Sequence, residues 1–229
     1  MDAIARKQMT SSASGLEVLD HCLLCGACER ICPSNVPYTE MLTKFRSSHF
    51  SHSTLGASTA LVLDSFKDYK AIVKTGNSLK IAQSMKLDSA LRFLPSNKSS
   101  ILPSQIALLS KAPKVSLCND LLINNPPNPS QTISLFLGCA DRIWQGKVFQ
   151  AAIHILNQLN IAVVIPKKQG CCGALNKHMG DIQSTSKLAT NNQQVLNQEM
   201  PLLYLSSGCG KTIQQQHPLA QSLSMMLVE

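Results

Sequence analysis

The residues best able to do chemistry in this sequence are its nine cysteines, four of which lie close together near the start of the chain. These four are Cys22, Cys25, Cys28 and Cys32, and Pro33 follows directly. The pattern C-x2-C-x2-C-x3-C-P is the ligand run that binds a [4Fe–4S] cluster in bacterial ferredoxins. Structural zinc sites usually use two separated cysteine pairs, so the spacing favours iron–sulfur chemistry over zinc. The run therefore predicts a cofactor that carries electrons.

The fourth ligand of such a cluster is an open question in this chain. In two-cluster ferredoxins the fourth cysteine of each run ligates the other cluster. This sequence contains one such run. Either Cys32 completes the cluster held by Cys22, Cys25 and Cys28, or a second run supplies the ligand. That second run would lie on a partner chain or upstream.

Four further cysteines form three groups, each flanked by glycine. The groups are Gly138-Cys139, Gly170-Cys171-Cys172-Gly173 and Ser207-Gly208-Cys209-Gly210. Each group follows a predicted strand, and the carboxyl ends of parallel strands meet at the usual ligand crevice of an open α/β sheet. The pattern favours a second metal or cluster site. Buried structural thiols and a redox-active disulfide remain as alternatives.

The elements that must position these groups alternate between strand and helix after residue 131. The expected strands are Thr132 to Leu137, Ile161 to Ile165 and Leu202 to Leu205. The apolar run of the second strand indicates burial on both faces. Helices are expected over 148–159 and 181–199. The apolar face of the first comprises Val148, Ala151, Ala152, Ile155, Leu156 and Leu159. This alternation predicts a parallel sheet with right-handed crossovers.

The part of the chain before residue 131 is expected to be helical. A helix is predicted from Tyr38 to Phe45, and two or three short helices are predicted within 47–110. Two sets of apolar residues at helical spacing support the latter: Val62, Phe66, Tyr69 and Val73, and Leu87, Leu91 and Leu94. Three prolines at positions 126, 127 and 129 mark the clearest linker.

The fold class expected from these elements is α+β to α/β, with an N-terminal helical ferredoxin-like cluster region followed by a small parallel α/β module. We expect a ferredoxin-type [4Fe–4S] region at 1–50, a helical spacer and proline-rich linker at 51–131, and a cysteine-rich module at 132–229. Cys118 stands apart from both cysteine groups and is expected to be an ordinary buried or free thiol.

Composition narrows the functional classes. The formal net charge is +8, but the basic residues are scattered and no stripe mixes them with aromatic residues, which argues against a nucleic-acid partner. The N-terminus has no apolar signal segment, and no stretch reaches the length of a membrane span. These features predict a cytoplasmic protein. Its positive charge would also suit a peripheral position at the inner face of the membrane.

The second cysteine group resembles a known family. The spacing Cys139-x31-Cys171-Cys172-Gly173-x35-Cys209 is similar to the CCG module found in heterodisulfide reductases, in the lactate-utilisation iron–sulfur protein and in the glycolate oxidase iron–sulfur subunit. The last is the most similar. The supporting stretches are Ser34-Asn35-Val36-Pro37-Tyr38 after the first run, Phe136-Leu137-Gly138-Cys139, and Ser207-Gly208-Cys209-Gly210.

This resemblance implies a non-catalytic electron-transfer subunit of a 2-hydroxy-acid (glycolate or lactate) oxidising complex. Such a subunit passes electrons from flavin-containing oxidase subunits toward quinone. The resemblance implies two ligand sets. Cys22, Cys25, Cys28 and Cys32 would bind a ferredoxin-type cluster, and Cys139, Cys171, Cys172 and Cys209 would form a CCG site able to hold a second cluster.

The chain also departs from the family pattern. The family has two ferredoxin runs and two CCG modules, whereas this chain has one of each, and Thr212 stands three residues after Cys209. We therefore expect a shortened relative or a piece of a longer protein. Two alternative functions remain open. One is a heterodisulfide reductase-like thiol/disulfide redox protein acting at Cys171 and Cys172, and the other is a degenerate zinc-bound or structural fragment.

Overall fold

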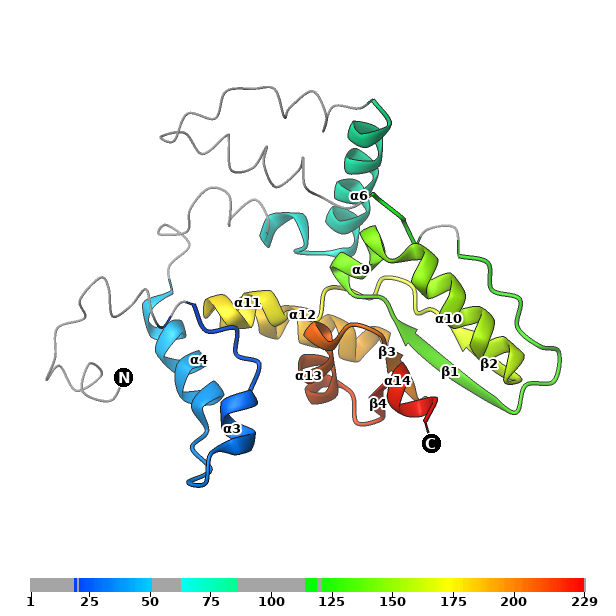
Figure 1. Cartoon of the computed structure of the whole chain (residues 1–229). Helices are drawn as coiled ribbons and strands as arrows, with labels where there is room; N and C mark the ends of the chain where they lie inside the picture. The colour runs from blue at the N-terminus through cyan, green and yellow to red at the C-terminus, as the bar shows by residue number, and fades with distance from the viewer. Residues whose placement is uncertain (1–18, 20, 51–62, 86–113, 119–120, 229) are drawn as a thin grey trace, which may run out of the picture.

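The computed structural model of the chain describes residues 19, 21–50, 63–85, 114–118 and 121–228. Helices make up its N-terminal part, and a small α/β unit follows (Figure 1). The helices of the first part are α3 (Ala27–Ile31), α4 (Tyr38–His49) and α6 (Tyr69–Ser84). The helix predicted from Tyr38 to Phe45 therefore runs one turn further.

The C-terminal part contains four strands and the helices that connect them. The strands are β1 (Gln131–Phe136), β2 (Ile161–Val164), β3 (Leu202–Tyr204) and β4 (Ala220–Ser222). The helices are α9 (Cys139–Trp144), α10 (Gly146–Gln158), α11 (Ala174–Met179), α12 (Ile182–Val195), α13 (Ser207–Gln216) and α14 (Leu223–Met226). The strand β4 was not predicted from the sequence, because it has only three residues, which are mostly polar and half-buried.

The four strands form one parallel sheet in the order β2-β1-β3-β4. β1 is central: Ile133 pairs with Val163 of β2, and Leu135 pairs with Leu203 of β3. This arrangement confirms the predicted fold class, a helical region followed by a small parallel α/β module. It also brings the carboxyl ends of β1, β2 and β3 to one edge of the sheet.

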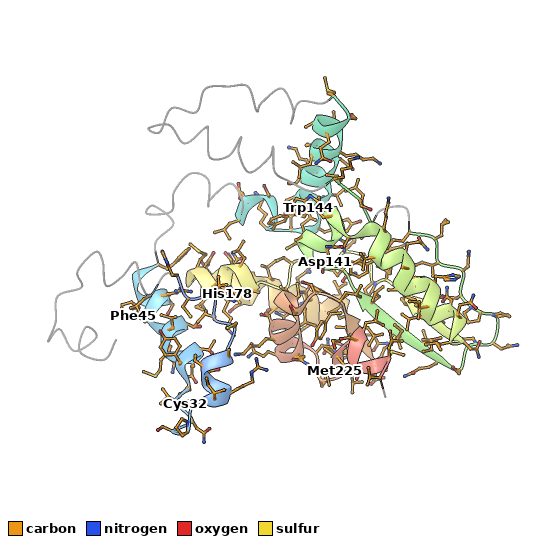
Figure 2. All side chains as sticks on the ribbon, in the orientation of Figure 1. Cys32, Phe45, Asp141, Trp144, His178 and Met225 are labelled. Atoms are coloured by element: carbon orange, nitrogen blue, oxygen red, sulfur yellow. The ribbon has the colours of Figure 1, made fainter. Side chains whose placement is uncertain are left out.

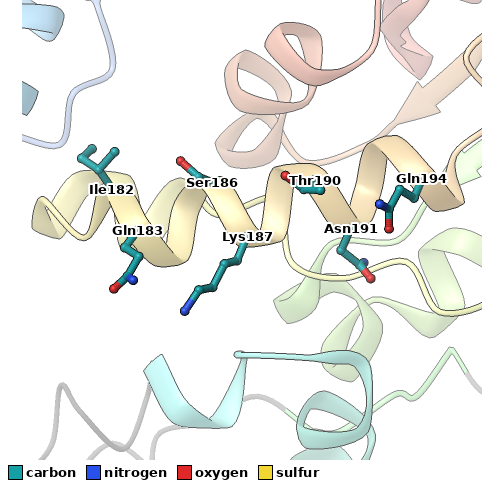
Figure 3. A pocket seen from close by; sticks show the side chains of 7 residues that line it. All are labelled: Ile182, Gln183, Ser186, Lys187, Thr190, Asn191 and Gln194. Atoms are coloured by element: carbon teal, nitrogen blue, oxygen red, sulfur yellow. The ribbon is translucent and has the colours of Figure 1, made fainter.

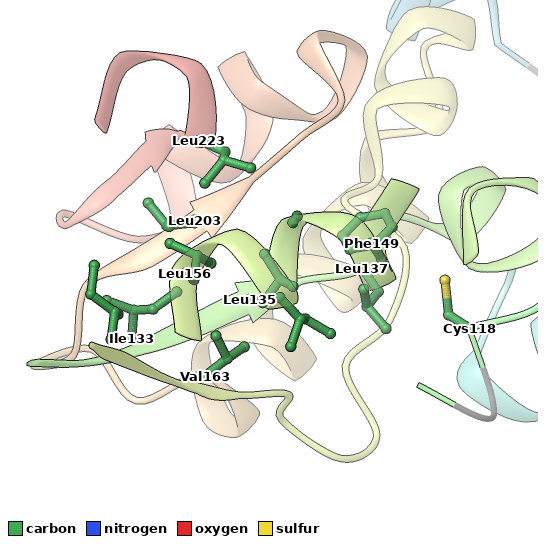
Figure 4. Close-up of a cluster of buried hydrophobic side chains, with 12 residues drawn as sticks. Cys118, Ile133, Leu135, Leu137, Phe149, Leu156, Val163, Leu203 and Leu223 are labelled. Atoms are coloured by element: carbon green, nitrogen blue, oxygen red, sulfur yellow. The ribbon is translucent and has the colours of Figure 1, made fainter. Parts of the chain in front are cut away.

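Each face of the sheet buries its own apolar cluster, because successive side chains of a strand point to opposite faces. On one face, Ile133 and Leu135 pack with Phe149 of α10 and Leu223 of α14 (Figure 4). The cluster on the other face contains Phe136, Leu188, Leu202, Tyr204 and Ile213, together with the three cysteines Cys171, Cys172 and Cys209. The core of the second face and the cysteine site are therefore one packed unit.

The apolar face predicted for residues 148–159 is largely wrong. Val148 and Ile155 are 49% and 44% exposed, and Leu159 is also exposed. The buried residues of α10 are Gly146, Phe149, Ala152, Ile153 and Leu156. The helix carries two overlapping apolar stripes, and burial of the large Phe149 ring removes more apolar area from water than burial of Val148.

The proline-rich segment is fastened along the outer edge of β2. The Asn125 side chain accepts a hydrogen bond from the Val163 N–H at 2.8 Å and donates one to the Val163 carbonyl at 3.1 Å. The Gln150 amide pairs in the same way with the backbone of Leu122. The Asn125 amide thus covers part of the free edge of β2, and the Gln150 amide ties the same segment to α10. β2 is buried from Ile161 to Val163, but Val164 is exposed, so burial on both faces holds only for its first three residues.

The apolar pattern of Phe66, Tyr69 and Val73 is divided between two helical segments, as expected for short helices, and Val62 lies outside the described residues. The chain turns near Lys67, and α6 begins at Tyr69. Asp68 caps it by accepting a hydrogen bond from the Ala71 N–H at 2.8 Å. The pattern at Leu87, Leu91 and Leu94 lies outside the described residues, and the domain division at residues 50 and 131 stays a prediction. Of the helices described, none is long and apolar enough to cross a membrane.

Candidate metal centres

The structure brings Cys139, Cys171, Cys172 and Cys209 together at the carboxyl ends of three neighbouring strands. The Sγ atoms of Cys139 and Cys171 are 3.2 Å apart. Cys172 forms side-chain hydrogen bonds with both Cys171 and Cys209. Cys139 is half-buried, and the other three are buried. A continuous chain of four sulfur atoms thus lies under the sheet edge.

Glycines allow the backbone to pass this close to the sulfur atoms. A Cβ atom on Gly138 would lie 3.0 Å from the Cys209 Sγ, closer than such atoms normally approach. Gly173 has a φ of +83° and turns the chain from Cys172 into α11. The left-handed region is costly for residues with a side chain, so this turn favours glycine.

A buried amide network holds the loop that carries the cysteine pair. Asn192 of α12 accepts a hydrogen bond from the Gly170 N–H at 2.9 Å and donates one to the Cys171 carbonyl at 3.0 Å. Gln216 of α13 donates to the Cys172 carbonyl at 2.8 Å. The Asn192 amide also donates to the Gln216 side chain at 3.2 Å. The backbone positions of Cys171 and Cys172 are therefore fixed from two helices.

These positioning residues were not predicted from the sequence. Asn192 stands in a polar stretch, 190–194, that is typical of a solvent-facing helix, and Gln216 ends a run of three glutamines. Gln169 was also missed, although it is fully buried and its side chain accepts a hydrogen bond from the Leu137 N–H at 3.0 Å. Only the tertiary structure distinguishes these amides from ordinary surface residues.

Hydrogen bonds and burial shift the pKa values of Cys139, Cys171 and Cys172 in different directions. Hydrogen bonds with the Cys139 and Cys172 side chains hold the pKa of Cys171 well below its usual range. The pKa of Cys139 is raised, first by its hydrogen bond with Cys171 and then by burial. The pKa of Cys172 is raised by its hydrogen bonds with Cys171 and Cys209. Cys171 is thus the sulfur most readily deprotonated, and a metal would displace the remaining protons.

The thiol donor set suits a soft metal or an iron–sulfur cluster. Among the described residues, however, no three or more Cys, His, Asp or Glu side chains are arranged so that they could hold a single metal ion. In a tetrahedral zinc site the sulfur atoms would lie about 3.8 Å apart, whereas Cys139 and Cys171 are 3.2 Å apart. The sulfurs fit such a group chemically, but they must spread to receive it.

The N-terminal cysteine run is presented differently. Cys25 and Cys28 are exposed, and Cys22 and Cys32 are half-buried. The backbone folds around the first sulfur: Leu24, with a φ of 52°, donates its N–H to the Cys22 Sγ at 3.4 Å. A backbone donor aimed at a cysteine sulfur suits a ligand that is bound as thiolate. The thiol donors and this backbone N–H therefore suit an iron–sulfur cluster chemically.

The loop is fastened to the α/β part through Arg46 of α4. The Arg46 guanidinium donates to the Cys22 carbonyl at 2.8 Å and to the His178 carbonyl of α11 at 2.7 Å. On α13, Lys211 lies 3.4 Å from the Glu29 carboxylate of α3. The two cysteine-bearing parts are therefore in direct contact, and Figure 2 shows His178 between the α4 region and the sheet.

Two further features, the buried thiol of Cys118 and a pocket along α12, lie away from the two cysteine groups. Cys118 is buried in the core on the α10 face of the sheet, as expected for an ordinary thiol, and burial raises its pKa to about 12. A shallow pocket of about 550 Å³ follows the outer side of α12 (Figure 3). Its lining residues are Ile182, Gln183, Ser186, Lys187, Thr190, Asn191 and Gln194. None of the cysteines lines it.

Comparison with known proteins adds the family context. Residues 133–214 match the CCG family, described as a cysteine-rich domain. The chain is 26% identical over 204 residues to the probable glycolate oxidase iron-sulfur subunit of Bacillus subtilis, covering 84% of this chain and 45% of that protein. It is 23% identical over 211 residues to the glycolate oxidase iron-sulfur subunit of Escherichia coli, covering 87% and 46%.

A third relative is a subunit of the CoM/CoB fumarate reductase of Methanothermobacter marburgensis, 26% identical over 91 residues, with coverage of 40% and 19%. No solved structure matches the chain. The chain spans less than half the length of these relatives. Residues 133–214, which include the four grouped cysteines, match the cysteine-rich CCG domain, and most of the chain is homologous to glycolate oxidase iron–sulfur subunits.

Proposed function

We propose that this chain is an electron-transfer iron–sulfur subunit of a complex that oxidises a 2-hydroxy acid such as glycolate or lactate. The observation that carries the proposal is the contact between two separate cysteine groups, joined by Arg46 and Lys211. Two relatives named as glycolate oxidase iron-sulfur subunits support the same role. A relay needs its carriers to lie close together, and this fold brings the two thiol sets onto adjoining elements.

The first carrier is a [4Fe–4S] cluster held by Cys22, Cys25 and Cys28, with Cys32 or a partner's cysteine as the fourth ligand. The cluster would give and take one electron at a time. The exposure of Cys25 and Cys28 supports a role at the surface, where electrons enter or leave. The Leu24 N–H directed at the Cys22 sulfur would stabilise bound thiolate.

The second carrier is a cluster at Cys139, Cys171, Cys172 and Cys209. Burial of this site keeps water away from the sulfurs. Asn192 and Gln216 would hold Cys171 and Cys172 in place while the charge on the bound group changes. A rigid, dry site of this kind lowers the cost of reorganisation during electron transfer.

The partners of this chain would be flavin-containing oxidase subunits that oxidise the hydroxy acid and hand over its electrons. This chain would pass them toward quinone, from a cytoplasmic position at the inner face of the membrane. Assembly with other subunits is supported by the two glycolate oxidase relatives, both of which are named as subunits.

The test is anaerobic purification of the full chain, with iron and sulfide analysis and low-temperature EPR. We expect two distinct clusters. Cys25→Ser should remove the ferredoxin-type signal alone, and Cys172→Ser should remove the second signal alone. A protein with intact thiols that takes up no iron on reconstitution would contradict the proposal, and tight zinc without visible absorbance would favour the structural alternative.

A second candidate function is thiol–disulfide exchange. The specific observation in its favour is the 3.2 Å separation of the Cys139 and Cys171 sulfurs, with Cys171 the more acidic thiol. The two thiols would form one disulfide and give two electrons and two protons to a substrate disulfide, releasing two thiols. Reduction of a disulfide substrate by the isolated, iron-free chain would support this function, and its loss in Cys139→Ser would assign the pair.

A further inference from the structure

Arg142 is a buried cation beside the CCG site. It lies in α9, three residues after Cys139, and only 6% of the residue is exposed. Its Nε and Nη2 atoms are buried and have no hydrogen-bond partner among the described residues. Buried charged donors are normally paired, because an unpaired one loses its hydration without compensation. An arginine in this state calls for an explanation.

Contacts with neighbouring elements do not provide the missing acceptor. The guanidinium carbon lies 4.9 Å from the centre of the Tyr69 ring of α6, which gives a cation–π contact but no acceptor for the free N–H groups. Cys118, on the segment before β1, is a protonated thiol near neutral pH because burial raises its pKa to about 12. The Asp141 carboxylate lies against Gly138, where a Cβ atom would be 2.7 Å from its Oδ2, and it accepts no hydrogen bond from the Arg142 Nε or Nη2.

The remaining neighbour is the cysteine site itself. Residues three apart on a helix lie on the same side, so Arg142 is one helical turn from Cys139. Cys139 is among the groups whose negative charge would favour the charged form of Arg142. A cluster ligated by four thiolates would place negative charge at this end of α9. The unpaired arginine and a thiolate-ligated cluster would therefore complement each other in charge.

We propose that Arg142 is the counter-charge of an anionic iron–sulfur cluster held by Cys139, Cys171, Cys172 and Cys209, and that it raises the reduction potential of that cluster. The inference rests on the proposed function of the CCG site. Reduction adds one electron to the cluster, so a nearby cation stabilises the reduced form more than the oxidised form. Burial makes this effect stronger than that of Lys177 or Lys211, which are closer to solvent and screened by it.

The test compares Arg142→Met, which keeps the length and removes the charge, with Arg142→Lys, which keeps the charge. Lys147→Gln is the matched control, because it removes an exposed positive charge from the next helix. Each full chain is reconstituted anaerobically and titrated with reductant while EPR follows both clusters. In Arg142→Met we expect the equilibrium constant for reduction of the CCG cluster to fall at least tenfold, about 59 mV for one electron.

Arg142→Lys should recover much of that loss, and Lys147→Gln should leave the potential nearly unchanged. The ferredoxin-type cluster should keep its potential in every variant. A CCG cluster whose potential is the same in wild type and Arg142→Met would overturn the role of Arg142 while leaving the proposed function intact. Iron signals that are the same in the wild type and in Cys172→Ser would overturn both the role of Arg142 and the proposed function of the CCG site.

Urea unfolding provides a second measurement that does not depend on the potential. In the metal-free chain Arg142 is unpaired, so Arg142→Met should not lower the midpoint of unfolding. In the loaded chain the same substitution should lower it. Equal destabilisation of both forms would make Arg142 a structural residue stacked on Tyr69, and would overturn the inference.

Discussion

The two cysteine groups of this chain present their thiols in opposite ways. Cys25 and Cys28 stand exposed on a loop and a short helix, close to the exposed side chains of Leu23 and Ile31. The CCG cysteines are collected from three strand ends, mostly buried, and held by side chains from two further helices. One group is local in sequence and open, and the other is assembled by the fold and closed.

The two cysteine groups therefore depend on different parts of the structure. The N-terminal run needs a short segment anchored by Arg46 and by the contact between Lys211 and Glu29, so its ligands can be completed by a partner that meets the loop from outside. The CCG site depends on the register of the sheet and on Asn192 and Gln216. Substitutions that destabilise the fold should therefore disrupt the CCG site before they disrupt the N-terminal run.

The largest contrast should appear in thiol reactivity. In the reduced, metal-free chain we expect an alkylating reagent at pH 8 to label Cys25 and Cys28 first. Cys118 should react about a thousandfold more slowly than a thiol of ordinary pKa, because its pKa is raised from 9.0 to about 12 and the thiolate is the reactive form. Peptide mass spectrometry at timed intervals measures each rate. The rate at Cys118 should rise about tenfold per pH unit until the pH nears 12.

The matched control for this experiment is the same labelling in mild urea, in which partial unfolding should expose Cys118 and raise its labelling rate. Equal labelling rates at Cys118 and Cys25 in buffer would contradict the buried position of Cys118 and the open position of the loop.

A smaller but still large effect is expected from Asn192→Ala. The substitution leaves the Gly170 N–H, the Cys171 carbonyl and the Gln216 side-chain oxygen without the Asn192 amide as their partner in a buried site. At about 1–3 kcal/mol for each orphaned group, and allowing for partial compensation, we expect a loss of roughly 3–5 kcal/mol in the free energy of unfolding. Urea unfolding measures it, and iron analysis should show loss of the CCG cluster alone.

Asn191→Ala is the control, since that neighbouring residue is exposed and faces the pocket on the outer side of α12. Similar losses in both variants would mean that the amide network does not position the cysteine pair.

The sequence predicts much of this arrangement but not the residues that hold it. Alternating apolar runs and glycine-flanked cysteines were enough to predict the parallel sheet and the strand ends at which Cys139, Cys171 and Cys209 lie. The apolar face of α10 could not be chosen from the sequence, because two stripes compete and only packing against β1 and β2 decides between them.

Side chains that act across the tertiary structure were also unpredictable. Arg46 contacts a carbonyl 132 residues away, and Asn192 and Gln216 resemble surface amides in their local sequence. Nothing in the sequence distinguishes Arg142 from a solvent-facing arginine. Polar residues of this kind are found only once the helices that carry them are placed.

The junction between the two sites can be broken at Gly180. This residue has a φ of +89°, and a Cβ atom there would lie 2.6 Å from the Arg46 carbonyl carbon. The left-handed backbone and the overlap together should make Gly180→Ala destabilising by about 2–4 kcal/mol. We expect limited proteolysis to cut near α4 while residues 131–228 stay protected. Gly208→Ala is the control, because its Cβ atom would make only an ordinary van der Waals contact, 3.8 Å from the Ser206 Oγ, and it should be neutral or slightly stabilising.

The smallest effect should come from the exposed contact between Glu29 and α13. Hydrogen bonds from Thr39, and then the charge of Lys211, hold the pKa of Glu29 below its ordinary value of 4.5. The folded form therefore binds the proton more weakly than the unfolded form. The stabilisation is present above pH 4.5 and is lost as the pH falls through the lowered pKa. Cleavage within residues 21–50 by pepsin, an acid-stable protease, should thus accelerate slightly below pH 4.5 in the wild type. Glu29→Gln should remove this pH dependence, because its amide does not titrate, and an unchanged profile would show that the contact does not help to fasten the loop.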